Sequence, residues 1–145
     1  MPSLSPDGKK IYYRILKGGT SPFLGASELW VADIVSGRNQ PLLPGFAVTG
    51  YDVSQDGRRI VFSAADSGGK SRLWMVPTDL SRAPSLIADA EGDMPHFDRA
   101  GEIVFHSIEG KSTFAFRIRE DGTEKRKLTI SEMISQVLGV RMASS

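Results

Sequence analysis

The residues best suited to chemistry are the two histidines and the carboxylates beside them. His96 and His106 are the only histidines among the 145 residues, and Asp98 and Glu109 lie near them. Two imidazoles and a carboxylate could hold a zinc ion. However, the histidines lack the close spacing of known zinc motifs, and each lies beside an aromatic residue of an expected strand. We therefore interpret both as structural residues and assign no metal ligand.

Two short charged runs could bind ions, but both have simpler structural explanations. The acidic run 89–93 lacks the ligand spacing of a calcium loop, and we interpret it as a solvated linker. The basic run Lys125–Lys127 could bind anions or nucleic acid, but Glu120, Asp121 and Glu124 cancel most of its field. We place this basic run on an outer strand, where lysines discourage pairing with other chains.

No motif for nucleophilic catalysis is present. The chain has no cysteine and no G-x-S-x-G elbow, and its serines lie mostly in expected turns. Asp7, Asp56, Asp98 and Asp121 recur at turns, which indicates turn chemistry rather than an acid–base pair. We expect that the chain is not an enzyme, and we assign no catalytic residue, no cofactor-binding residue and no cofactor.

The composition is that of a folded protein, with 40% hydrophobic and 24% charged residues. Eighteen basic and seventeen acidic side chains give a net charge of +1, which does not provide the field of a general nucleic-acid binder. No apolar run approaches the roughly 20 residues that would cross a bilayer, and no secretory signal is visible. We therefore expect no nucleic-acid partner and no membrane span.

The turns repeat, and each leads into an apolar strand. The first corner is Ser5–Gly8 and the second is Ser54–Gly57, whereas Phe97–Gly101 is a weaker third copy. Their glycines are 49 and 44 residues apart. A period of this length predicts one supersecondary unit per copy.

A second marker confirms the phase of the repeat. Trp30, Trp74 and Phe116 recur at intervals of 44 and 42 residues, and we interpret them as core residues wedged between units. The expected strands, by residue number, are 11–15, 28–34, 40–43, 47–53, 59–64, 72–76, 85–87, 94–97, 103–108, 113–119 and 125–130, with 134–140 as the first strand of a fourth unit.

Four short antiparallel strands per unit predict an all-β fold of three propeller blades, an open or partial β-propeller. Near-continuous apolar strands fit blades that are covered on both faces, so a two-sheet sandwich ranks second. The predicted boundaries are 1–45 for the first blade, 46–91 for the second, 92–130 for the third and 131–145 for a fourth blade or tail.

These corners and strands resemble the TolB-type, WD-repeat-like propeller family. The resemblance rests on Pro2–Tyr13, Val53–Phe62, Pro95–Gly101 and Arg119–Thr129. It implies a non-catalytic, bacterial and periplasmic module for protein–protein interaction, scaffolding or sensing. The alternative is that it is the propeller portion of a larger serine peptidase, sensor kinase or transcription regulator.

Three units are too few to close a ring, since propellers usually have 4–8 blades. The sequence is therefore expected to be a fragment of a larger propeller or, less favoured, to self-associate through its open blade edges. A protein partner would contact the blade-connecting loops or the channel rim, for which the candidates are Lys17–Ser27 and Asp66–Ser71.

Overall fold

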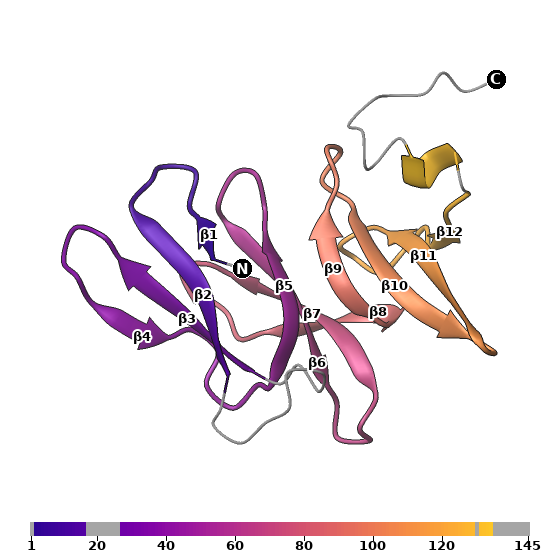
Figure 1. Cartoon of the computed structure of the whole chain (residues 1–145), viewed down its shortest axis with the longest axis horizontal. Helices are drawn as coiled ribbons and strands as arrows, with labels where there is room; N and C mark the ends of the chain where they lie inside the picture. Colours follow the sequence, from indigo (N-terminus) through magenta and orange to yellow (C-terminus); the bar gives the residue numbers. More distant parts are fainter. Residues whose placement is uncertain (1, 17–26, 130, 135–145) are drawn as a thin grey trace.

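The chain folds almost entirely into antiparallel strands (Figure 1). The computed structural model describes residues 2–16, 27–129 and 131–134. A short helical segment at 131–134 contains the helical residues of that part of the chain, and no helix there is long and apolar enough to cross a membrane. The strands are β1 (Ser3–Leu4), β2 (Lys10–Leu16), β3 (Ser27–Asp33), β4 (Asn39–Pro41), β5 (Val48–Val53), β6 (Arg59–Ala65), β7 (Ser71–Pro77), β8 (Ser85–Glu91), β9 (Asp93–Phe97), β10 (Ile103–Glu109), β11 (Ser112–Ile118) and β12 (Arg126–Lys127).

Pairing groups these strands in fours, each an antiparallel meander. Strands β1 to β4 form the first group, β5 to β8 the second and β9 to β12 the third, and we call them blades 1, 2 and 3. A single pairing of Ser27 with Val48 joins β3 to β5, whereas blade 3 is a separate sheet. The blades follow one another from left to right in Figure 1, as in an open segment of a β-propeller.

The hydrophobic core lies in two layers between the blades. One cluster joins blades 1 and 2 and includes Leu29 and Phe62, and the other joins blades 2 and 3 and includes Val61 and Phe105. Val61 and Phe62 are neighbours in β6, are both fully buried and belong to different clusters. Because successive side chains of a strand point to opposite faces, β6 is covered on both sides. This is why the predicted strands show no clear alternation.

The repeated corner is a small hydrogen-bonded unit at one end of each of the first two blades. The hydroxyl of Ser5 donates to the carboxylate of Asp7 (2.6 Å), and that of Ser54 donates to Asp56 (2.5 Å). Each hydroxyl also accepts the backbone N–H five residues further on, at 2.9 and 3.0 Å. These serine hydroxyls hold the pKa of both aspartates below the usual value. The carboxylates therefore serve their own turns, as the repetition predicts.

The corners of neighbouring blades also touch. Gly57 has φ near +72°, and a Cβ built on it would lie 2.8 Å from Cδ of Pro6 in the preceding corner. Gly8 has the same φ but nothing within 4 Å of the corresponding point. A side chain at Gly57 would therefore meet both backbone strain and the ring of Pro6.

The linker interpretation of the acidic run 89–93 is wrong. Asp89 to Glu91 belong to β8 and Asp93 begins β9, so only Gly92 connects blades 2 and 3. A Cβ on Gly92 would lie 2.3 Å from the carbonyl oxygen of His106. Because Gly92 has no side chain, the connection between the blades packs closely against β10, and a solvated linker would not be packed in this way.

Two other predictions, the fourth-unit strand and the three core aromatic residues, agree with the structure only in part. Ile134, where the fourth-unit strand 134–140 was expected to begin, ends the helical segment, and 135–140 lie outside the described residues. Phe116 is buried and Trp74 packs against the core of blades 1 and 2. Trp30 is only half-buried, because it lies on the opposite face of β3 from Leu29, which packs against blade 2.

Candidate functional site

The sequence candidates for metal binding are not brought together. His96 is exposed on β9 and is paired across the sheet with Val104, whereas His106 on β10 is half-buried opposite Asp93. Within the described residues, no group of three or more His, Cys, Asp or Glu side chains could hold a metal ion. Asp98, the carboxylate nearest in sequence to His96, is used in a different way.

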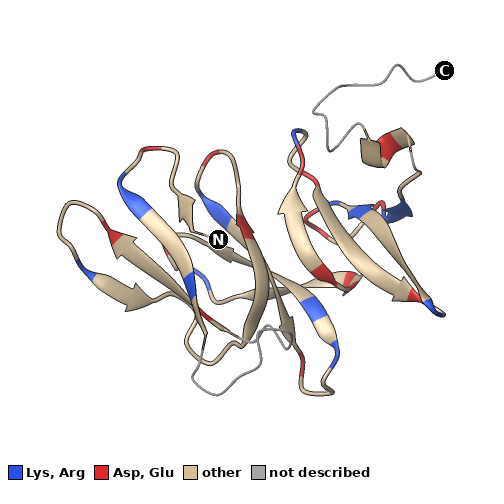
Figure 2. Cartoon of the chain, viewed as in Figure 1, with Lys and Arg blue, Asp and Glu red and all other residues tan. Residues whose placement is uncertain are grey.

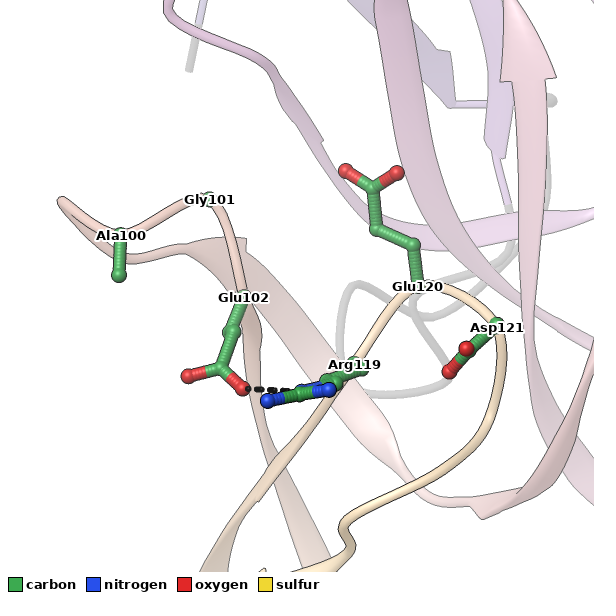
Figure 3. A pocket seen from close by; sticks show the side chains of 6 residues that line it. All are labelled: Ala100, Gly101, Glu102, Arg119, Glu120 and Asp121. Atoms are coloured by element: carbon green, nitrogen blue, oxygen red, sulfur yellow. Dashed lines mark ion pairs between the residues drawn. The ribbon is translucent and has the colours of Figure 1, made fainter.

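One hollow among the described residues lies at the corner end of blade 3. It is a shallow, open hollow with a volume of about 560 Å³, bordered by the β9–β10 corner on one side and the β11–β12 turn on the other (Figure 3). The figure shows an ion pair between Glu102 and Arg119 on its floor, with Glu120 pointing away from both. The lining residues are Ala100, Gly101, Glu102, Arg119, Glu120 and Asp121.

A second hollow, of about 240 Å³, adjoins the first along Ala100 and Gly101. It lies between the corners of blades 2 and 3, whereas the first hollow is lined by residues of blade 3 alone. We call them the corner hollows. The second is lined by Ser54, Gln55, Asp56, Arg59, Phe97, Asp98, Arg99, Ala100 and Gly101.

The corner of blade 3 is built differently from the other two. The backbone N–H of Asp98 donates to the carbonyl of Glu102 (2.8 Å), the role that the N–H groups of Ser5 and Ser54 fill in their corners. Asp98 therefore stands in the place of the serine, and the turn is one residue shorter. One carboxylate oxygen accepts the N–H groups of Ala100 (2.9 Å) and Glu102 (3.0 Å). The other oxygen is left for a partner outside the turn.

That partner is Arg117 on β11. Its Nε lies 2.7 Å from Oδ2 of Asp98, and its terminal nitrogen lies 2.6 Å from a carboxylate oxygen of Glu102. The other oxygen of Glu102 is 3.5 Å from Nε of Arg119. The side chain of Asp98 is only 3% exposed, so this ion pair is largely removed from water. The network fixes the blade 3 corner, which lines both hollows, to β11.

The opposite wall is held by contacts between blades. Arg59 on β6 forms an ion pair with Glu120 in the β11–β12 turn, and its guanidinium lies 5.5 Å from the ring centre of Phe97. The backbone N–H of Phe97 donates to the carboxylate of Asp52 on β5 (2.7 Å). Burial raises the pKa of Asp52, because the charged form is partly removed from water. These contacts hold blade 2 against blade 3 beneath the hollows.

A polar cluster also joins the inner strands of blades 2 and 3. One carboxylate oxygen of Asp93 accepts hydrogen bonds from the hydroxyls of Thr49 and Ser63, both at 2.8 Å. Ser63 is fully buried, and its hydroxyl lies 2.8 Å from that of Thr49. The cluster satisfies buried polar groups where β5 and β9 adjoin without pairing.

The basic run is occupied by structural contacts. Arg126 and Lys127 form β12, which lies at the edge of its sheet, as predicted. The ammonium of Lys127 is 2.7 Å from Glu109 and 4.0 Å from the ring centre of Phe114. Lys125 lies 3.6 Å from a carboxylate oxygen of Asp89, so the run fastens the outer strands.

The predicted binding loops are not part of the hollows. In Figure 1 the β6–β7 turn, which with the first residue of β7 makes up the candidate loop Asp66–Ser71, lies at the lower end of blade 2, and the corners lie at the upper end. The Asp66 carboxylate accepts the N–H groups of Gly68 and Lys70 in its own turn. Of the loop Lys17–Ser27, residues 17–26 lie outside the described part, and Ser27 is buried at the start of β3.

The sequence analysis missed the charged walls of the corner hollows. Arg117 in β11 and Arg119 just beyond its end flank the buried Ile118, so charged residues alternate with an apolar one along this stretch. This alternation was the available signal for a charged strand face. No sequence pattern pointed to Arg59 or Glu120, which meet only because two blades pack together.

The architecture is that of a partial β-propeller, and similar propellers occur among solved structures. No family model matches the chain, and no curated protein matches it in sequence. TolB from Acinetobacter baumannii is 20% identical with a TM-score of 0.68, and the match covers 89% of this chain and 31% of that one. The putative TolB from Agrobacterium tumefaciens is 26% identical with a TM-score of 0.68, covering 86% of this chain and 46% of that one.

A propeller from an enzyme is also similar. The β-propeller domain of the Trilobed protease from Pyrococcus furiosus is 24% identical with a TM-score of 0.59, and the match covers 89% of this chain and 42% of that one. The chain thus spans less than half the length of each of these three proteins. The comparisons identify the propeller fold and its TolB-like character.

Proposed function

We propose that this chain is a non-catalytic β-propeller module that binds another protein at the corner hollows. The observation that carries the proposal is the pair of adjoining hollows, one at the corner end of blade 3 and one between the corners of blades 2 and 3, where ion pairs hold the corners in place. A site whose walls are already ordered loses little conformational entropy when a partner binds.

The charges of the corner end favour a polypeptide partner. Figure 2 shows acidic and basic residues next to one another on the three corner turns at the upper end of the blades. Arg99 is exposed at the edge of the second hollow, and Asp121 is exposed at the edge of the first. A mixed rim suits a peptide segment that carries both signs of charge.

The test uses a displayed library of random twelve-residue peptides, selected on the immobilised chain. The double charge reversal Arg99→Glu/Arg119→Glu should weaken the selected peptides at least tenfold in solution titrations. The matched control Lys70→Glu reverses one charge at the opposite end of blade 2 and should leave binding unchanged. Peptides that bind the double variant as tightly as the parent chain would place the site elsewhere.

The second candidate is the propeller portion of a larger enzyme. It is favoured by the similarity to the propeller domain of a protease and by the partial coverage of every similar structure reported above. The genomic reading frame around these residues distinguishes the candidates. A peptidase or kinase motif in the same frame supports the second, and blades alone support the first.

We further propose a periplasmic location in a bacterium, which rests on the TolB-like resemblance. Fractionation of cells that express the tagged full-length protein tests it, because the tag should follow a periplasmic marker on osmotic shock. Recovery with the cytosolic marker would reject this location.

A further inference from the structure

The three corners can be compared position by position, because each ends on a glycine with positive φ. The backbone N–H of that glycine donates to the carbonyl of the residue three positions earlier, which is a serine in two corners and Asp98 in the third. The residue that directly follows this acceptor is the second corner residue. It is Pro6 in blade 1, Gln55 in blade 2 and Arg99 in blade 3.

At the junction of blades 1 and 2, the ring of Pro6 packs on the corner of the following blade. A Cβ built on Gly57 would lie 2.8 Å from Cδ and 3.1 Å from Cγ of Pro6, so the ring rests directly against the α-carbon of this glycine. The second corner residue of one blade therefore fills the space above the corner glycine of the next.

At the junction of blades 2 and 3, the same contact is missing. Gln55 stands in the place of Pro6 and is exposed, and a Cβ built on Gly101 would have no packing neighbour within 4 Å among the described residues. The second corner hollow lies in this space, since Gln55 and Gly101 both line it. Blades 2 and 3 are both present on either side, so the hollow arises from the residues of the junction and not from an end of the row.

The second corner hollow has the surroundings that suit a proline ring. Its volume of about 240 Å³ leaves room for the ring, and Gly101 permits the close approach that is seen at Gly57. The half-buried ring of Phe97 also lines the hollow, and the guanidinium of Arg59 lies 5.5 Å from the centre of that ring. Proline segments dock in aromatic-lined grooves, because the fixed φ of proline reduces the entropy lost on binding.

The charges beside the hollow favour an acidic neighbour of that proline. Ala100 stands where the other two corners have an aspartate, and Asp98 is already paired with Arg117 on β11. The exposed cation of Arg99 is therefore not neutralised by its own corner. On the opposite side of the hollow, the carboxylate of Asp56 accepts hydrogen bonds from its own turn.

We propose that the second corner hollow is a proline subsite, in which a partner protein places the ring of an exposed Pro–Asp or Pro–Glu segment on Gly101, as Pro6 is placed on Gly57. This inference rests on the function proposed above and names the sequence that the partner presents. The dipeptide Pro6-Asp7 of the first corner is itself such a segment. The partner thus makes at the second junction the contact that the chain makes by itself at the first.

The peptides selected from the displayed library are the probes for this subsite. Those that bind the double variant Arg99→Glu/Arg119→Glu at least tenfold more weakly than the parent chain are the corner peptides. Most corner peptides should contain a proline next to an aspartate or glutamate. Replacing that proline by alanine in the synthetic peptide should weaken binding to the parent chain at least tenfold.

The variant Gln55→Pro fills the hollow from within the chain. The turn should accept it, because the first two corners share the same hydrogen bonds and Pro6 takes this position in the first. Gln55→Pro should bind the corner peptides at least tenfold more weakly than the parent chain. The matched control Gln55→Ala leaves the hollow open and should bind them as tightly as the parent chain.

The backbone amide resonance of Gly101 reports whether a ring enters the hollow. It should shift when a corner peptide is added to the parent chain, and it should already be shifted in Gln55→Pro without peptide. The midpoint of urea unfolding of Gln55→Pro should be no lower than that of the parent chain. A folded Gln55→Pro variant with an unshifted Gly101 resonance would contradict the equivalence of the two junctions.

The outcomes separate this inference from the proposed function. Corner peptides that lack proline, or that bind Gln55→Pro as tightly as the parent chain, overturn the proline subsite and leave peptide binding at the corner hollows standing. A selection that yields no peptide sensitive to Arg99→Glu/Arg119→Glu rejects both.

Discussion

Nε of Arg117 lies 2.7 Å from Oδ2 of Asp98, a carboxylate whose other oxygen accepts two backbone N–H groups of its own turn. In the first two corners, a serine and an aspartate share the turn hydrogen bonds. In the third corner Asp98 alone accepts the turn hydrogen bonds, and it also forms an ion pair with Arg117 on β11. The weakest copy of the sequence repeat is therefore the corner with the most partners.

Asp98→Ala should destabilise the chain by about 1–3 kcal/mol, because it removes the buried partner of Arg117, which keeps Glu102, and the acceptor of two turn N–H groups. Urea unfolding followed by circular dichroism measures this loss. Asp121→Ala, which removes an exposed turn aspartate of blade 3, is the control and should have a much smaller effect. Equal losses would mean that the ion pair adds nothing beyond turn formation.

Trp74→Ala should destabilise the chain by about 3 kcal/mol or more, because its ring packs against two aromatic neighbours. Its ring centre lies 5.1 Å from that of Phe46 and 6.3 Å from that of Phe62. His96→Ala removes an exposed side chain and should change stability by about 0.5 kcal/mol or less. Thermal melts that rank the two variants in the opposite order would contradict the packing assignment.

Asp52→Asn should stabilise the chain increasingly as pH rises above the ordinary aspartate pKa of about 4. Burial raises the pKa of Asp52, so the folded chain binds this proton more tightly than the unfolded chain. The parent chain therefore loses stability from this group as pH rises through the raised pKa. Asparagine keeps an oxygen for the N–H of Phe97 and carries no charge.

The opposite sign is expected for Asp66→Asn. The N–H of Lys70 lowers the pKa of Asp66, so this carboxylate stabilises the folded chain above pH 4 and loses that effect as pH falls. Urea unfolding at pH 3, 4, 5, 6 and 7 compares both variants with the parent chain. Parallel curves for Asp52→Asn and the parent would contradict the raised pKa.

Gly92→Ala should destabilise the chain by about 1–3 kcal/mol or more, since the new methyl group would overlap backbone. The Cβ position lies 2.3 Å from the carbonyl of His106 and 2.7 Å from the ring of Phe105. Gly68→Ala is the matched control, because its Cβ would meet only the side chain of Asp66 at 3.3 Å. A mild effect at Gly92 would show that blades 2 and 3 can separate there at low cost.

The repeat predicted the strands well because each unit carries its own local signals. Corner residues and apolar runs located every strand of the three blades in the described residues except β1, and the outer position of Lys127 followed from edge chemistry. The acidic run 89–93 was misread, because its charges suggested solvent while Ala90 and Gly92 faced a neighbouring blade.

The corner hollows could not be predicted in the same way. Arg59 and Glu120 are 61 positions apart in the sequence and belong to different blades, so their ion pair depends on how the blades stack. In the sequence, Asp98 cannot be distinguished from the turn aspartates Asp7 and Asp56. Only its backbone hydrogen bond to Glu102 shows that it replaces a serine and is free to bind Arg117.

The double coverage of β6 has a consequence for unfolding. Because Phe62 supports the layer against blade 1 and Val61 the layer against blade 3, β6 cannot unfold without exposing both layers. A chain whose units touch only their neighbours can open gradually from its ends. Here β6 links the two layers, so the three blades should melt together in a single cooperative transition.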